Sequence, residues 1–592
     1  MSHAHQADTR PATGGAISRA VARLRSEARR FLLLTIVAIG ALCGALAVLF
    51  HEFVEAARGL LIGRALSASE PWNWIFTVIT PAVVFALIAW CIRRFAPRAV
   101  GANLARVRIA YNSDPAAVGP RSIAATFLAT PLSLGAGAPL GPEGPIVVVT
   151  SGASAAVARM LRLPRRLVRG MIPVGVAAGI AAIFNTPITG VVFALEEVFG
   201  SAERGLLGGV IVGAVSAAVV ERSLLGGQPL LAAPFTTWRD ARELIGFALV
   251  GVLAGVFSGY AISLTHHLKR RWAAAMPSML LRAALAGLLI GGLGLLAPSI
   301  LGVGYGSVSL WLHGGGTAEQ TALAFGAKSV GFVIALSAGI LGGTFAPSLF
   351  MGAALGAVIG HLAQRMFPGA GIDPRAYALL GMGSFFAGLL RSPIAAVLIV
   401  VELTRDYELM IPLMLAVSLS VAISRRVSRH SMVEQQMIDE GYIEASESSD
   451  PLASARVSDV MTAHAITVST GMTLLDAARA VAGSHHRFYP VTDGGAGLAG
   501  VLSRDSIERA AREGNSERPV SEYLEKPKLV AVASERVIEL VKRMQLAGAD
   551  RAPVIDSGQT RRVVGFISPA DILRARMRRS PSEEESPFEI FE

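Results

Sequence analysis

Long apolar stretches fill much of the chain and limit what it can fold into. The four clearest ones cover Phe31–Phe50, Trp74–Cys91, Leu244–Ala261 and Leu280–Leu296. Each is close to the roughly 20 residues that an α-helix needs to cross the hydrocarbon core of a bilayer. Charged residues make up only 16% of the 592 residues, whereas soluble domains carry about 25%. The sequence therefore predicts a polytopic α-helical membrane protein that contacts membrane lipid.

The net charge and the two cysteines bear on whether the chain binds nucleic acid, forms disulfides or holds a metal ion. The formal net charge is +11, but basic residues at the ends of membrane helices anchor cytoplasmic loops, so we expect no nucleic-acid partner. Cys43 and Cys91 both lie in apolar stretches, where cysteine is usually a small buried hydrophobe. We therefore expect neither a disulfide framework nor a metal site.

Changes in polarity along the chain predict its domains. The first residues are polar and basic and have no signal-peptide cleavage pattern, which predicts a cytoplasmic segment. The predicted parts are a cytoplasmic N-terminal segment (1–29), a membrane domain (30–430), a polar linker (431–456), two soluble α/β modules (457–512 and 519–577) and an acidic tail (578–592).

Two pairs of segments indicate an internal repeat in the membrane domain. FNTPITGVVFALEE at 184–197 resembles LLRSPIAAVLIVVE at 389–402, and in each a proline is followed nine residues later by a glutamate. Upstream, GPEGP at 141–145 matches GTFAP at 343–347 with nearly the same separation. Two matches at one separation are harder to produce by chance than either match alone.

The positive-inside rule predicts that the two repeats are inverted. If the N-terminus is cytoplasmic, the second apolar stretch returns to the inside at Arg93 and Arg94. The stretch that begins at Leu244 ends at Lys269–Arg271, so it runs the opposite way to its counterpart. Inverted repeats are typical of transporters whose site lies near the bilayer midplane. We expect a bacterial-type inner membrane, with both termini cytoplasmic.

Glycine and proline interrupt the apolar sequence at 132–145 and again at 337–347, each time just before a new helix. Non-helical backbone at membrane depth is tolerated where it is buried in protein or lines a cavity. The free N–H groups and partial positive charge of a helix N-terminus attract an anion. Glu143 lies in the first of these turns, where its carboxylate could occupy the anion site and act as a gate. The alternative is a glutamate that only caps its own helix.

These blocks, GPEGP, FNTPITGVVFALEE and GGTFAP (342–347), resemble the CLC chloride channel and transporter family over about residues 30–430. The resemblance implies the CLC fold and a homodimer with one pore per subunit. It implies Glu143 as the gate and Glu197 as an internal proton-transfer group, although Glu197 could also be a helix-end carboxylate without that role. The implied anion contacts are Gly141, Gly144, Pro145, Ile146, Gly343, Thr344, Phe345 and Ala346.

The chain departs from the family pattern in three places. The family's Gly-Ser-Gly-Ile-Pro block falls at residues 101–105, so its serine is missing; the anion contacts expected there are Gly101, Ala102 and Asn103. The family's central tyrosine falls at about Val433, and Arg108 stands where exchangers often have an acid. Losing both hydroxyl donors should weaken the central site. We therefore expect chloride, or a similar small anion, to pass through a channel-like pore, with chloride/proton antiport as the alternative.

Other function classes fit the sequence less well. His51, Glu52 and Glu55 almost form the HExxH motif of an intramembrane zinc protease, but the second histidine is absent. We therefore do not expect an enzyme. A cation transporter regulated by CBS modules would need acidic or carbonyl-lined sites, whereas glycine and proline at helix starts predominate here.

The two C-terminal modules share one plan, in which a short strand and a helix precede strands ending in PVTD…GVLS or PVID…GFIS. This plan resembles a tandem pair of CBS modules. In such pairs, a serine followed three residues later by an aspartate often holds the ribose of an adenine nucleotide. Ser568 and Asp571 match this pattern, although the same residues could simply cap the helix that begins there.

Overall fold

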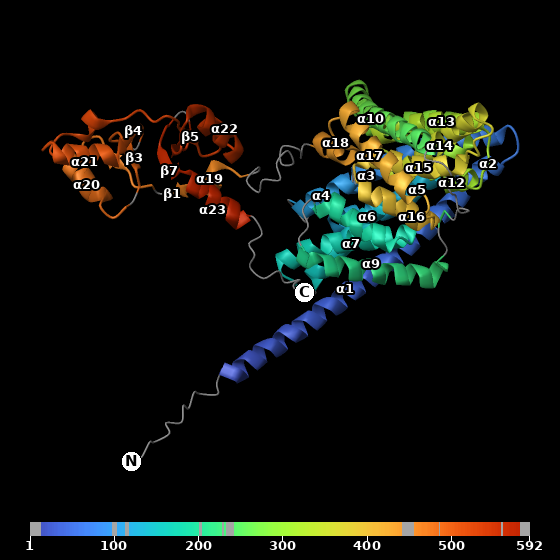
Figure 1. Cartoon of the computed structure of the whole chain (residues 1–592), viewed down its shortest axis with the longest axis horizontal. Helices are drawn as coiled ribbons and strands as arrows, with labels where there is room; N and C mark the ends of the chain where they lie inside the picture. The colour runs from blue at the N-terminus through green and yellow to red at the C-terminus, as the bar shows by residue number, and fades with distance from the viewer. Residues whose placement is uncertain are drawn as a thin grey trace, which may run out of the picture. The chain divides into compact units, whose positions relative to one another are not determined.

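The computed structural model describes residues 14–97, 103–112, 118–199, 204–227, 230–231, 242–440, 455–463, 465–484, 486–495, 497–557 and 560–579. The chain divides into two compact units, and the boundary falls after Glu440. The first is called the membrane unit below, and the second the C-terminal unit. Figure 1 labels most of the helices and strands of both.

The membrane unit is helical throughout its described residues. Its first half contains α1 (Gly14–Arg58), α2 (Arg64–Ser67), α3 (Trp72–Phe95), α4 (Leu104–Asn112), α5 (Pro120–Gly135), α6 (Glu143–Met160), α7 (Arg165–Phe184), α8 (Pro187–Ala194) and α9 (Arg204–Leu225). Its second half contains α10 (Glu243–Ala275), α11 (Met279–Leu296), α12 (Tyr305–Leu312), α13 (Ala318–Ala338), α14 (Phe345–Met366), α15 (Pro374–Leu390), α16 (Pro393–Thr404), α17 (Met410–Val427) and α18 (Met432–Asp439). Within the described ranges, nine helices are long and apolar enough to cross a membrane, and the four stretches predicted from the sequence lie in α1, α3, α10 and α11.

The two repeats contact each other through reciprocal helix caps. The Glu196 carboxylate accepts hydrogen bonds from the first-turn amides of α16, Ile394 at 3.1 Å and Ala395 at 2.9 Å. The Glu402 carboxylate does the same at the start of α8, where it accepts from the Ile188 and Thr189 amides. The first amides of a helix have no partner inside it, so a carboxylate placed there stabilises the helix. The repeated spacing from proline to glutamate is thus the spacing of two exchanged caps.

Glycine permits the closest helix packing in this unit. α14 and α15 pack along Gly352 and Gly356 on one helix and Gly381 on the other. A Cβ atom on Gly356 would lie 2.0 Å from the Tyr377 carbonyl oxygen, and one on Gly352 would lie 2.2 Å from the Gly381 carbonyl oxygen. Membrane helices approach this closely through small residues, because lipid supplies no hydrophobic drive for association.

Helix α18 lies inside the segment 431–456, for which the sequence predicted a linker. Its start is closed by a reciprocal pair of hydrogen bonds between Ser431 and Glu434. Near its end, Asp439 pairs with Lys269 at 2.9 Å and with His266 at 2.7 Å, both on α10. Polar residues there hold a helix against the membrane unit rather than spacing two domains. Residues 441–454 of the predicted linker lie outside the described residues.

The C-terminal unit is built of two similar α/β modules. Its strands are β1 (Thr462–Ala463), β2 (Val468–Ser469), β3 (Phe488–Thr492), β4 (Leu498–Ser503), β5 (Ala531–Val532), β6 (Ala552–Ile555) and β7 (Val563–Ile567). Its helices are α19 (Val457–Val460), α20 (Leu474–Val481), α21 (Arg504–Arg512), α22 (Val537–Ala547) and α23 (Pro569–Arg579). The sheets have the orders β2-β3-β4 and β1-β7-β6-β5.

The shared plan predicted from the sequence is visible in the strand pairing. In the first module β2 is parallel to β3, which is antiparallel to β4; in the second β5 is parallel to β6, which is antiparallel to β7. β1 comes from the start of the first module but pairs with β7 of the second. The two modules therefore share a sheet and form one folded body.

Candidate anion site

Glu143 begins α6 and its side chain is completely buried. The Tyr305 hydroxyl, at the start of α12, donates a hydrogen bond to Oε1 at 2.5 Å. The Ala346 amide, in the first turn of α14, points at Oε2 at 3.4 Å. One carboxylate thus lies among the starts of three helices. A buried carboxylate needs such donors, because the bare charge is costly away from water.

The starts of α6 and α14 meet through a short backbone bridge. The Gly141 amide donates to the Gly343 carbonyl at 2.9 Å, and the Gly343 amide donates back at 2.5 Å. A Cβ on Gly343 would lie 2.7 Å from the Gly144 nitrogen, so the approach requires glycine. The sequence predicted that these two interrupted segments face one place, and the structure brings them together.

The other predicted anion contacts occupy the same two helix starts, but their amides differ in what they offer. Pro145 has no N–H, and the Ile146 amide is already bonded to the Pro142 carbonyl at 3.0 Å. Thr344 is the residue before α14, and Phe345 and Ala346 form its first turn. Of these predicted contacts, the Ala346 amide is the one that reaches the Glu143 carboxylate.

An aromatic cluster lies against the start of α14. The Phe345 ring is 4.7 Å from the rings of Phe193 and Phe386, measured between centroids, and 6.2 Å from that of Phe184. All four side chains are buried. Apolar rings beside a charged site exclude water, and this strengthens the electrostatic interactions of whatever occupies it.

The third predicted anion block is only partly described. Gly101 and Ala102 lie outside the described residues, and Asn103 precedes α4. The Asn103 side-chain oxygen is buried and has no hydrogen-bond partner in the described part of the chain. Val433, at the position expected for the family's central tyrosine, is buried on α18. The valine side chain offers no hydrogen-bond donor there.

Glu197 lies in the π-helical turn Leu195–Phe199 that follows α8, and it is 4% exposed. Its carboxylate accepts a hydrogen bond from the Ser392 hydroxyl, and Arg108 on α4 attracts it electrostatically. Its neighbour Glu196 caps α16. The two adjacent acids therefore differ: one satisfies helix amides, and the other lies buried with one hydroxyl.

Sequence reasoning missed Ser392, Tyr305 and Lys328. Lys328 is fully buried in α13, and its ammonium donates to the carbonyls of Ile300 at 3.0 Å and Gly302 at 2.7 Å. A lysine within an apolar helix can be recognised from the sequence as a candidate functional residue. Tyr305 offered no such signal, because its importance comes only from the fold.

The rejected zinc motif does not form a metal cluster in the structure. His51, Glu52 and Glu55 lie on α1. Among the residues that the structure describes, no group of three or more histidine, cysteine or acidic side chains could hold a metal ion.

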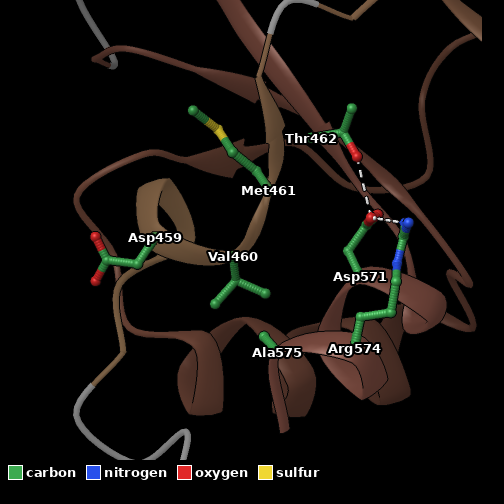
Figure 2. Close-up of a pocket in the computed structure, with 7 residues that line it drawn as sticks. All are labelled: Asp459, Val460, Met461, Thr462, Asp571, Arg574 and Ala575. Atoms are coloured by element: carbon green, nitrogen blue, oxygen red, sulfur yellow. Dashed lines mark hydrogen bonds and ion pairs between the residues drawn. The ribbon is translucent and has the colours of Figure 1, made fainter. Parts of the chain in front are cut away.

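In the C-terminal unit, a pocket of about 210 Å³ is lined by Asp459, Val460, Met461, Thr462, Asp571, Arg574 and Ala575 (Figure 2). Asp571 Oδ1 accepts from Thr462 at 3.0 Å and from Arg574 at 2.6 Å. Asp571 Oδ2 accepts from the Ser568 amide at 2.9 Å and from its hydroxyl at 2.6 Å. Both residues of the predicted ribose pattern are therefore engaged with the protein itself.

The sequence matches the models of two protein families. The model described as voltage gated chloride channel matches residues 82–425. The CBS domain model matches twice, over residues 457–513 and 520–578. The first match covers more than half of the chain.

Two named relatives resemble the chain over 48% and 64% of its length. It is 33% identical over 288 residues to a putative chloride channel protein ClcB-like of Ralstonia nicotianae, covering 48% of this chain and 67% of the relative. It is 28% identical over 386 residues to the H⁺/Cl⁻ exchange transporter ClcA of Klebsiella pneumoniae, covering 64% and 82%.

Two solved structures have a similar fold. A slow cyanobacterial Cl⁻/H⁺ antiporter superposes with a TM-score of 0.64 at 23% identity, covering 69% of this chain and 98% of that one. A eukaryotic CLC transporter superposes with a TM-score of 0.65 at 18% identity, covering 93% and 98%.

Proposed function

The chain belongs to the voltage-gated chloride channel (CLC) family, and on that premise we propose that it exchanges chloride for protons across a membrane, with Glu143 as the gate. The observation that carries the proposal is the Glu143 carboxylate, which lies between the starts of α6 and α14. An anion that displaced it would face the same donors. Protonation removes the charge of the carboxylate and its hold on those donors, so the side chain can leave and an anion can enter.

The choice of exchange over conduction reverses the expectation from the sequence. Missing serine and tyrosine donors favoured a channel, but relatives 28–30% identical are named H⁺/Cl⁻ exchange transporters. A second buried acid also supports exchange. Glu197 has one hydroxyl donor, from Ser392, and no helix-capping amide is described for it. A buried ionisable group of this kind suits a proton-transfer step.

Passive conduction remains a second candidate because of one specific observation. Val433 stands on α18 where the family's tyrosine is expected, and its side chain cannot hold a central anion. A weakly held anion could pass without exchanging for a proton. The two candidates differ in a single measurable quantity, which is proton movement per anion.

The test is anion efflux from proteoliposomes with simultaneous recording of pH. An imposed chloride gradient should drive protons against their own gradient, and this would establish exchange. Anion flux without any proton movement would overturn exchange in favour of conduction. Absence of anion flux, with cation flux in its place, would overturn both.

We also propose a homodimer with cytoplasmic termini. Apolar side chains are exposed along several helices of a single chain, where they face lipid or a second copy: Ile188, Ile211, Val215, Ile394, Ile411 and Met414. Arg93, Arg94, Arg425 and Arg426 lie in the last turns of α3 and α17, which supports a cytoplasmic location for these ends. Cross-linking in native membranes tests the dimer, and protease accessibility of the C-terminal unit tests the orientation.

For the C-terminal unit we propose an adenine nucleotide as ligand of the pocket in Figure 2. CBS modules bind such nucleotides, and Asp571 lines the pocket. Typical small-molecule pockets measure about 300–1,000 Å³, so a pocket of about 210 Å³ would take only part of a nucleotide. Arg574 or Thr462 would have to release Asp571 for a ribose to bind it. Binding of radiolabelled ATP, ADP or AMP to the purified full chain tests this proposal.

A further inference from the structure

We propose that the Tyr305 hydroxyl is a ligand of the transported anion as well as the donor that holds Glu143 in place. This inference rests on the proposed function and deepens it by naming one residue of the anion site. The hydroxyl lies 2.5 Å from Glu143 Oε1. An anion that takes the place of the carboxylate would therefore meet the same hydroxyl.

The chemistry of the hydroxyl suits both occupants. A tyrosine hydroxyl has one hydrogen to donate, and either a carboxylate oxygen or a halide can accept it. Hydrogen bonds from neutral donors to charged acceptors are shorter and stronger than those between neutral groups. The hydroxyl donors expected from the family resemblance are absent at Ala102 and Val433. Tyr305 supplies a hydroxyl from a different helix.

The backbone before Tyr305 is shaped so that the ring faces Glu143. Gly304 has φ of +92°, a conformation in which a side chain would be strained. A Cβ atom there would also lie 2.6 Å from the ring of Phe350. Glycine therefore lets the chain turn sharply just before α12 begins.

Lys328 binds the loop that precedes Tyr305. Its ammonium donates to three successive parts of it, the carbonyls of Ile300, Gly302 and Val303, at 3.0, 2.7 and 3.3 Å. An ammonium has three N–H groups, so all three are used. Its fourth neighbour is the Phe350 ring, whose centroid is 4.8 Å away. Lys328 thus acts on the site through the loop, as a positioning residue for Tyr305.

Tyr305 and Lys328 are also the titratable side chains that interact with Glu143 in the described part of the chain. The Lys328 ammonium already donates to three carbonyls, so it has no N–H group left to bind the Glu143 carboxylate when that side chain moves. The hydroxyl has the carboxylate as its partner. When Glu143 leaves, an incoming anion is the acceptor that restores this hydrogen bond.

The test measures chloride binding to purified full-length protein by titration calorimetry. Glu143→Ala vacates the carboxylate position, so chloride should bind there. Adding Tyr305→Phe, which removes only the hydroxyl, should weaken chloride binding about tenfold. Tyr377→Phe is the matched control, because Tyr377 is a buried tyrosine that does not contact Glu143; added to Glu143→Ala, it should leave the affinity unchanged.

The outcomes separate this inference from the proposed function. Unchanged affinity in the Glu143→Ala/Tyr305→Phe protein would overturn the role of Tyr305 and leave the gate intact. No chloride binding to Glu143→Ala itself would overturn the anion site and this inference together. If Tyr305→Phe prevents folding, anomalous scattering from bromide bound to Glu143→Ala decides the matter. Bromide within hydrogen-bonding distance of the Tyr305 oxygen supports the inference, and bromide elsewhere overturns it.

A second readout uses the intact gate. Tyr305→Phe removes a donor to the ionised Glu143, so the carboxylate should give up its place at a higher pH. The pH of half-maximal anion flux should therefore rise by about one unit. An unchanged pH profile would contradict the holding role, since a purely structural effect would alter the rate without moving the midpoint.

Discussion

Two carboxylates at helix starts, Glu143 in the membrane unit and Asp571 in the C-terminal unit, differ in the hydrogen-bond donors that surround them. Asp571 has four hydrogen bonds from protein donors, two on each oxygen. Glu143 has the Tyr305 hydroxyl on Oε1, a longer contact from the Ala346 amide on Oε2 and a hydrogen bond from its own backbone amide. A carboxylate with every acceptor position filled stabilises its helix. A carboxylate with few donors can leave its place when an anion can accept the same hydrogen bonds.

The comparison teaches that residue type and position at a helix start do not decide the role of an acid. Under the proposed function, the number of donors and the ease of replacing them decide it. Glu196 and Glu402 belong with Asp571, because each satisfies two amides of a facing helix. Glu197 belongs with Glu143, because it is buried with a single hydroxyl.

The largest expected effect is that of Glu143→Gln, because glutamine is neutral at every pH and mimics the protonated gate. Proton coupling should be lost completely while anion flux persists, and the flux should become nearly independent of pH. Proteoliposome flux with simultaneous pH recording measures both quantities. Coupling that survives in this variant would place Glu143 with the fixed helix caps and break the comparison.

Glu197→Gln should have the next largest effect. Proton movement per anion should fall by about a hundredfold or more, the effect typical of losing a positioned proton-transfer group, while anion flux should change little. Glu221→Gln is the control, because Glu221 is a buried acid on α9 that contacts neither Glu143 nor Ser392. If both variants kept full coupling, Glu197 would be a structural carboxylate.

Lys328→Met tests the support beneath the site. Removing the ammonium leaves three carbonyls without their donor in an apolar interior, and each such group costs about 1–3 kcal/mol. The free energy of unfolding should fall by roughly 3 kcal/mol or more. Thermal unfolding in detergent tests this, because the midpoint temperature should fall as well. Lys269→Met is the control: the Lys269 side chain is 38% exposed, and Asp439 keeps its pair with His266 when the ammonium is removed, so the effect should stay below about 1 kcal/mol.

Asp571→Asn should have the smallest effect. Asparagine keeps one acceptor oxygen, so loss of the hydrogen bonds at the start of α23 should destabilise the C-terminal unit by about 1 kcal/mol. Anion flux without added nucleotide should not change. Asp505→Asn, at the corresponding helix start of the first module, serves as the control. A large loss of flux in Asp571→Asn would contradict a capping role for the carboxylate.

The sequence by itself determined the membrane helices, the internal repeat and the CBS pair. Hydrophobic length, proline-to-glutamate spacing and repeated strand patterns are local properties, so they can be read without knowing which segments touch. It also singled out both glycine-rich helix starts, because glycine and proline at membrane depth have few structural explanations. Polarity did not predict the helix within 431–440, since a polar segment that forms ion pairs with α10 looks like a linker until its partner is known.

Only the tertiary structure showed that Tyr305 lies beside Glu143, whereas the family resemblance had already placed Ala346 at this site. Tyr305 and Ala346 are distant from Glu143 in sequence and reach it because α12 and α14 start beside α6. The same holds for Ser392 beside Glu197. Hydrogen bonds act over about 3 Å, so the donors of a buried acid depend on which helix starts the fold brings together, and local sequence does not record that.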